Sequence, residues 1–166
     1  MVLMLPHKFT PYDLALTLKQ AILTVFRIPV IDMYPDIVEN LFRGYVFSFE
    51  STHNDTHLKT TITISPHKFC KGRPSTRTSC FVIAETTYTV HKSTSMDSYK
   101  DYHLCNISGY DQLPNVLTII QESVLGVIYS SLIPHPYVQL FDIDLDSTLQ
   151  SLELSSPVIP IKSQIP

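Results

Sequence analysis

The sequence predicts an α+β protein in which a four- to five-stranded antiparallel sheet packs against two long amphipathic helices. Near each end of the chain, apolar residues recur with the 3.6-residue period of a helix. From residue 45 to residue 107 they alternate with polar residues instead, as in strands that bury one face. Polar turns separate these alternating runs at short intervals, which favours hairpins and therefore antiparallel pairing.

The first long helix is expected to begin after Thr10 and to reach Phe26. The Thr10 hydroxyl can cap free backbone N–H groups, and Pro11 suits the first helical position. Pro29 ends the helix because it cannot continue the hydrogen-bond ladder. The apolar stripe that predicts the buried side is formed by Leu14, Leu18, Ala21, Ile22 and Val25.

A shorter helix is expected to follow, from Pro35 to Phe42. Proline again suits the first helical position, and Ile37, Val38 and Leu41 recur with helical spacing. Gly44 can end this helix because glycine readily adopts the left-handed conformation of a helix C-terminus.

Four strands are expected in two hairpins. The first hairpin joins residues 45–50 to residues 58–64 through the turn-rich stretch 51–56. The second joins residues 80–90 to residues 99–107. In the first three strands one set of alternate residues is mainly apolar and is expected to face the core.

The last long helix is expected to open at Pro114, with an apolar face made by Val116, Ile120, Val124, Val127 and Ile128. A fifth strand is predicted over Tyr137–Leu145, where apolar residues alternate with aspartates. The predicted order of elements is therefore α-α-β-β-β-β-α-β.

Residues 1–154 are expected to form a single domain, and residues 155–166, with three prolines, an extended or disordered tail. The first nine residues lack the long apolar core of a signal peptide, and the three cysteines are an odd number. We therefore expect an intracellular protein, cytoplasmic or nuclear. The apolar stretch 113–133 is not expected to span a membrane, because Glu122 lies at its centre.

Composition argues against several classes of protein. Charged residues make up 16% of the chain, against about 25% in an average soluble protein. The four glycines are too scattered to form a phosphate-binding loop or a G-x-S-x-G nucleophile motif. Standard nucleotide-binding proteins and α/β-hydrolases are thus disfavoured. Seven histidines and many serines make a Ser-His-Asp combination unavoidable by chance, so no catalytic residue is assigned. No cofactor is expected.

A basic loop is the best functional lead in the sequence. Residues 66–79 contain Lys68, Lys71, Arg73 and Arg77 and no acidic residue. Such a loop can hold a phosphate, an anionic membrane surface or RNA. The simpler interpretation, a solvated connection between two hairpins, is favoured over it.

Two sets of residues have the spacing of metal ligands. Asp142, Asp144, Asp146 and Glu153 match the carboxylate positions of an EF-hand calcium loop, but Ser147 stands where that loop needs glycine. The candidate zinc ligands are His67, Cys70, Cys80, His103 and Cys105. They contain no C-x-x-C motif, and two of the cysteines suit burial as small apolar residues. No metal site is assigned.

These observations favour a non-enzymatic structural or interaction protein that binds a protein partner or a second copy of itself. A small viral structural protein of matrix type, or a viral accessory protein, fits the low charge and scarce glycine. Two alternatives stay open: binding of nucleic acid or an anionic membrane through residues 66–79, and a zinc- or calcium-binding protein or metalloenzyme. If both long helices cover one face of the sheet, the other is the expected contact surface, with Lys59, Thr61 and Thr63 as its first candidates.

Overall fold

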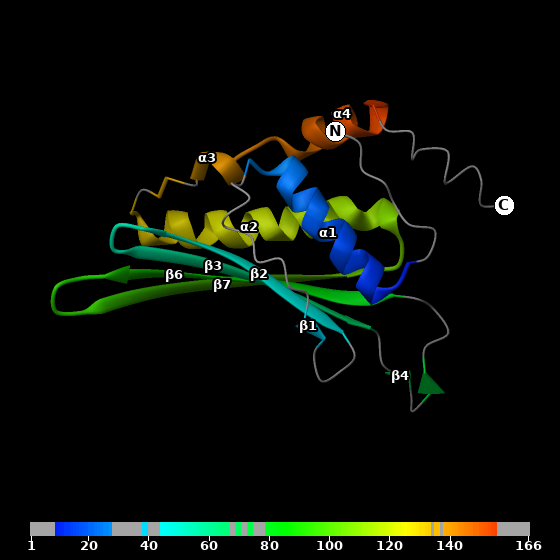
Figure 1. Cartoon of the computed structure of the whole chain (residues 1–166), viewed down its shortest axis with the longest axis horizontal. Coiled ribbons are helices and arrows are strands. Elements are labelled where there is room, and N and C mark those ends of the chain that lie inside the picture. Colours follow the sequence, from blue (N-terminus) through cyan, green and yellow to red (C-terminus); the bar gives the residue numbers. More distant parts are fainter. Residues whose placement is uncertain are drawn as a thin grey trace.

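A computed structural model describes residues 9–27, 38–39, 44–66, 69–70, 73–74, 79–133, 135–136 and 138–155. The predicted α+β class is confirmed: an antiparallel sheet carries helices on one face (Figure 1). Two further strands of two residues each, β4 (Phe69–Cys70) and β5 (Arg73–Pro74), form a separate small hairpin.

The main sheet has five strands in the order β1-β2-β3-β6-β7, and all neighbours are antiparallel. The strands are β1 (Val38–Glu39), β2 (Tyr45–His53), β3 (Thr56–Pro66), β6 (Cys80–His91) and β7 (Met96–Ile107). Both predicted hairpins are confirmed, although their strands are longer than expected. The turn between β2 and β3 contains only Asn54 and Asp55, and Asn54 adopts a left-handed φ of 51°.

The two long helices begin and end close to the predicted residues. Helix α1 (Pro11–Val25) is capped by Thr10, whose hydroxyl oxygen accepts a hydrogen bond from the Asp13 backbone N–H at 3.1 Å. A short 3-10 helix, η2 (Tyr110–Gln112), leads into α2 (Leu113–Ser131). Every residue of the two predicted apolar stripes is buried.

Two predicted elements are wrong. Within the shorter helix expected over residues 35–42, Val38 and Glu39 form β1, because they pair with Val46 and Tyr45 of β2. The rest of that prediction lies outside the described residues. The fifth strand expected over residues 137–145 is replaced by two helices, α3 (Val138–Phe141) and α4 (Leu145–Ser155).

Asp144 explains why α4 forms. Its carboxylate accepts hydrogen bonds from the Ser147 N–H at 3.3 Å and from the Ser147 hydroxyl at 2.8 Å, as an N-terminal cap does. These hydrogen bonds also lower the pKa of Asp144. The proline-containing tail after residue 155 lies outside the described residues, and the expected single domain stays a prediction.

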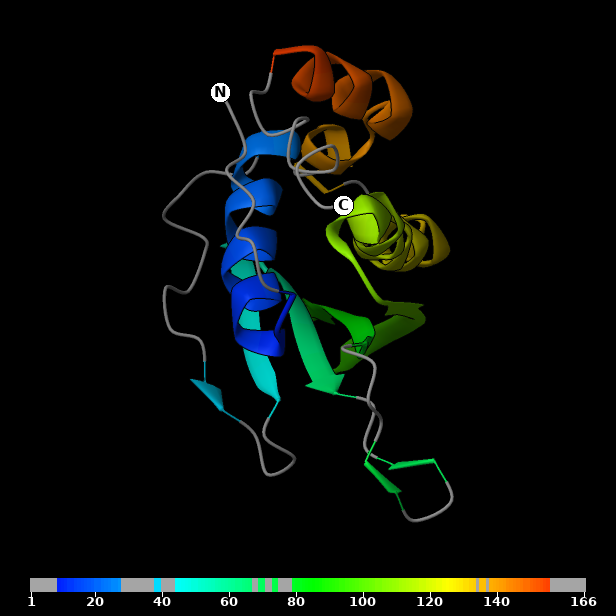
Figure 2. The same cartoon turned by 90° about the vertical axis from the view of Figure 1, so that its right-hand side faces the viewer.

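The helices form two layers above the sheet. Helices α1 and α2 lie on the sheet itself, with α3 and α4 further out (Figure 2). Phe141 of α3 reaches the core, where its ring packs against Phe26 at 5.1 Å and stacks on Phe49 of β2 at 5.8 Å between ring centroids. The core therefore lies between the helices and a single face of the sheet.

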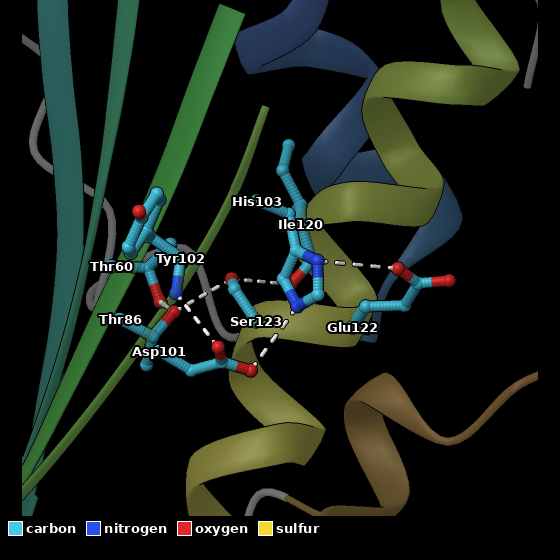
Figure 3. A network of polar contacts seen from close by, with 8 residues as sticks. All are labelled: Thr60, Thr86, Asp101, Tyr102, His103, Ile120, Glu122 and Ser123. Atoms are coloured by element: carbon cyan, nitrogen blue, oxygen red, sulfur yellow. Dashed lines mark hydrogen bonds and ion pairs between the residues drawn. The ribbon is translucent and has the colours of Figure 1, made fainter. Parts of the chain in front are cut away.

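A chain of buried hydroxyl groups connects this face of the sheet to α2 (Figure 3). Thr60 of β3, Thr86 of β6 and Ser123 of α2 are all fully buried. Their oxygens are 2.9 Å and 2.8 Å apart in that order, and Ser123 donates to the Ile120 carbonyl at 3.0 Å. Because each hydroxyl has one proton, Ser123 accepts from Thr86 and Thr86 accepts from Thr60. The chain thus fixes where α2 sits across β3 and β6.

We expect Thr86→Val to lower the free energy of unfolding by about 1 to 3 kcal/mol, because it leaves the buried Thr60 hydroxyl without its acceptor. Urea unfolding measures the change. The matched control is Thr89→Val on the same strand, whose side chain points to the other face and should change stability by less than about 0.5 kcal/mol. Equal effects of the two substitutions would contradict a structural role for the hydroxyl chain.

Candidate protein-interaction surface

The face of the sheet opposite α1 and α2 is the candidate interaction surface, here called the uncovered face. None of the described helices lies on it (Figures 1 and 2). Thr63, Ile83 and Leu104 lie side by side across β3, β6 and β7 on this face. The next row is formed by Thr61, Glu85 and Tyr102. The prediction that the helices leave one face of the sheet exposed is therefore confirmed for the described residues.

An apolar patch lies on the uncovered face over β6 and β7. It consists of Phe81, Ile83, Tyr102 and Leu104, whose exposed fractions are 38%, 36%, 61% and 54%. Ile83 and Leu104 are direct cross-strand neighbours. Full burial of one such side chain is worth about 1.5 to 3 kcal/mol, so a cluster of them exposed together favours contact with a partner.

Charges on the uncovered face cancel. Over β2, β3, β6 and β7 its acidic residues are Glu50 and Glu85, and its basic residues are Lys59 and Lys100. Lys100 lies 3.4 Å from Glu85, and Glu50 contacts the His57 ring at 2.9 Å. A face without net charge suits an apolar or self-complementary partner better than nucleic acid.

Lys59, Thr61 and Thr63 lie on this face, as predicted. The apolar patch beside them was not predicted, although the sequence contains a signal for it. Phe81, Val82 and Ile83 form an unbroken apolar run, so both faces of β6 must be apolar at its start.

A second polar cluster lies where β7 meets α2 (Figure 3). The His103 ring contacts the Asp101 carboxylate at 3.1 Å through Nε2 and the Glu122 carboxylate at 3.6 Å through Nδ1. Ser123 follows Glu122 but does not form a catalytic triad with this pair, because its hydroxyl is buried and bonded to Thr86 and Ile120. Within the described residues, no group of three His, Cys, Asp or Glu side chains has the geometry of a metal site.

The structure does not bring the described zinc candidates together around one point. Cys80 is buried in the core opposite Ile107, and Cys105 lies opposite Val82. Burial raises the pKa of both thiols to about 11. His103 is held by Asp101 instead. His67 and the Cys70 side chain lie outside the described residues.

The calcium candidates do not form an EF-hand loop. Asp144 caps α4, Asp146 lies in the first turn of that helix, and Asp142 accepts a hydrogen bond from the Tyr129 hydroxyl at 3.2 Å. Helix α4 thus occupies the stretch that the loop would need. The Glu153 side chain lies outside the described residues.

The basic loop remains untested. Lys68, Lys71 and Arg77 lie outside the described residues, and for Arg73 only the backbone is described, in β5. Anion binding by residues 66–79 therefore stays a prediction.

A cavity of about 580 Å³ lies at the far end of the β2–β3 hairpin. It is lined by His53, Asn54, Asp55, Thr56, Ile133, His135 and Pro136. The His135 ring is buried and meets the Tyr88 ring edge-on at 5.2 Å. Burial, together with the nearby His53, lowers the pKa of His135 from 6.5 to about 4. The imidazole of His135 is therefore uncharged at neutral pH.

Stability should fall as the pH is lowered from about 6.5 towards 4, because the unfolded chain takes up a proton at His135 that the folded chain excludes. We expect a loss of about 2 kcal/mol across this range, measured by urea unfolding. His135→Phe should remove this contribution. His53→Asn should keep most of it, since burial is the larger cause of the shift. An unchanged pH dependence in His135→Phe would contradict this account.

Comparison with known proteins gives no match: no protein-family model, curated protein or solved structure is significantly similar to this chain. No helix in the described part of the chain is long and apolar enough to cross a membrane. An intracellular location stays a prediction. Any functional inference therefore depends on the geometry of the chain itself.

Proposed function

We propose that this protein is a non-enzymatic structural or interaction protein that associates with a second copy of itself through the uncovered face of its sheet. The observation that carries the proposal is the apolar patch of Phe81, Ile83, Tyr102 and Leu104 on the face opposite the helices. The patch lies over β6 and β7, which pair with each other along their whole length, so it is presented on a rigid support. Rigid, exposed apolar surface loses little conformational entropy on binding.

Charge favours a second copy as the occupant of this face. Two acidic and two basic side chains give the face no net charge, so two copies brought face to face do not repel one another. Each copy also offers the other both signs, since Glu85 and Lys100 are neighbours. Two sheets packed in this way lie about 10 Å apart with their strands within about 30° of each other.

The composition of the whole chain supports the same proposal. A formal net charge of −3 on 166 residues gives only weak repulsion between copies. The threonine hydroxyls beside the patch are neutral and can lie against an identical surface. The more specific role of a viral matrix-like or accessory protein stays a prediction.

Ile83→Glu should weaken self-association at least about tenfold, because burying an unpaired carboxylate in an apolar interface costs more than about 1.4 kcal/mol, in addition to the apolar contact that is lost. Sedimentation velocity over a concentration series measures the dimer dissociation constant. Leu16→Glu is the matched control: Leu16 has a similar exposed fraction, 43%, but lies on α1. It should leave the constant unchanged.

Two outcomes would overturn the proposal. One is a wild-type chain that stays monomeric at about 1 mM, a concentration at which a Kd of 1 mM still gives abundant dimer. The other is an equal loss of association in the Ile83 and Leu16 variants. Native mass spectrometry of the same samples separates self-association from the metal-binding alternative, since a stoichiometric zinc or calcium adduct would favour the latter.

A further inference from the structure

Strand β7 is the last strand of the sheet within the described residues, and it pairs there with β6 alone. One hydrogen bond shows which residues of β7 point their backbone N–H and C=O groups away from β6. The His91 N–H donates to the Asp55 carbonyl in the β2–β3 turn, so the odd-numbered residues of β6 point their backbone groups towards β3. The even-numbered residues of β6 therefore bond to β7, with Val90 opposite Asp97.

On β7 it follows that odd-numbered residues bond to β6 and even-numbered residues point their N–H and C=O groups outward. A second hydrogen bond agrees with this assignment. The Tyr102 N–H donates to the carboxylate of the adjacent Asp101 at 2.9 Å instead of to β6. The outward residues are Met96, Ser98, Lys100, Tyr102, Leu104 and Asn106.

The carboxylate of Asp101 blocks the middle of this edge to an incoming strand. One carboxylate oxygen accepts a hydrogen bond from the outward N–H of Tyr102, and the other contacts the His103 ring at 3.1 Å. Gly126 of α2 leaves the space for this carboxylate, because a Cβ atom at that position would collide with it. A charged side chain placed on an edge strand is a known means of discouraging unwanted strand pairing.

We infer that β7 pairs antiparallel with β7 of a second copy. The two-fold axis that relates the copies is perpendicular to the sheet and passes midway between the two Tyr102 residues; it is called the axis at Tyr102. The pairing exchanges two hydrogen bonds between the two Tyr102 residues. It also places Asp101 opposite His103 of the second copy, and this contact occurs twice. The two Asp101–His103 contacts that the separate chains contain are thus replaced by two such contacts between the chains.

Other registers of the same pairing are less favourable. An axis at Asp101 puts the two Asp101 carboxylates opposite each other, and an axis at Lys100 does the same for two ammonium groups. With the axis at His103, Asp101 faces Cys105 and gains no partner. The axis at Tyr102 pairs a carboxylate with an imidazole and places two aromatic rings side by side.

The same arrangement accounts for selectivity towards a second copy. Any incoming strand must displace Asp101 from the Tyr102 N–H. A strand without a hydrogen-bond donor opposite Asp101 leaves the displaced carboxylate oxygen without a new partner, which costs free energy. A second copy supplies His103 at the required position.

The edge interface uses the backbone of β7, whereas the face interface proposed above uses side chains, although Tyr102 and Leu104 belong to both. Ile83 lies on β6, one strand in from the edge, so Ile83→Glu disables the face and leaves the β7 backbone untouched. The failure of one interface can therefore be distinguished from the failure of the other.

Cysteine cross-linking tests the register. In an Ile83→Glu background with Cys70 and Cys105 replaced by serine, Tyr102→Cys should form a disulfide-linked dimer under mild oxidation. Residues directly opposite in a hydrogen-bonded antiparallel pair have Cα atoms about 5.5 Å apart, within disulfide reach. Lys100→Cys and Leu104→Cys should each stay monomeric alone and should cross-link when mixed, because Lys100 faces Leu104 of the second copy.

A Tyr102→Cys variant that stays monomeric would overturn the inference. So would Lys100→Cys or Leu104→Cys chains that cross-link alone as readily as Tyr102→Cys, since that requires another register. If wild-type association is lost in Ile83→Glu and no cross-link forms, the face interface stands and the edge interface fails.

Amide exchange on the unmodified chain gives an independent measurement. The outward amides of Ser98, Lys100 and Leu104 should exchange at least about tenfold more slowly at a concentration where the protein is dimeric than at one where it is monomeric. The inward amides of Asp101 and His103 should not change, since β6 already protects them. Outward amides that exchange at one rate at every concentration would overturn the inference even if every cysteine variant failed to fold.

Discussion

The packing of α1 and α2 against a single face of the sheet is the constraint on which the rest of the structure depends. It buries alternate residues of β2, β3 and β6 and half-buries those of β7, and the hydroxyl chain from Thr60 to Ser123 fixes α2 across β3 and β6. Because both long helices lie on that side, the described residues leave the other face bare. The exposure of the apolar patch follows from this one-sided arrangement, and Gly126 of α2 leaves the space for the Asp101 carboxylate at the β7 edge.

Much of the fold could be predicted because its signals are local. Thr10 and Pro11 define the start of α1, and the alternation in residues 45–107 predicts both hairpins. The errors arose where the local pattern was ambiguous. The alternation over residues 137–145 suits a strand, but α3 forms within that range and Asp144 caps α4 at its end. Strand β1 exists because Val38 pairs with Val46, and no pattern in residues 35–42 contains that contact.

Less of the site could be predicted. The uncovered face follows from the two apolar stripes, but the sequence could not show whether Ile83 points to solvent or to the core. The role of Asp101 depends on which backbone groups of β6 bond to β3, and that is set by the contact between His91 and Asp55. The separation of the described metal candidates also could not be foreseen from the sequence. Cys80 and Asp144 have other roles, in the core and at a helix start, that spacing alone does not reveal.

The uncovered face and the β7 edge are two different surfaces of one sheet, and the presence of both has a consequence for symmetry. A chain with one self-complementary surface stops at two copies. The axis that relates two edge-paired strands is perpendicular to the sheet, whereas the axis that relates two stacked sheets is parallel to it. Two such axes generate a closed set of four copies if they meet and an unlimited array if they do not. Where both proposed interfaces form, the position of the two-fold axis of the face interface relative to Tyr102 decides whether four copies close or the array grows.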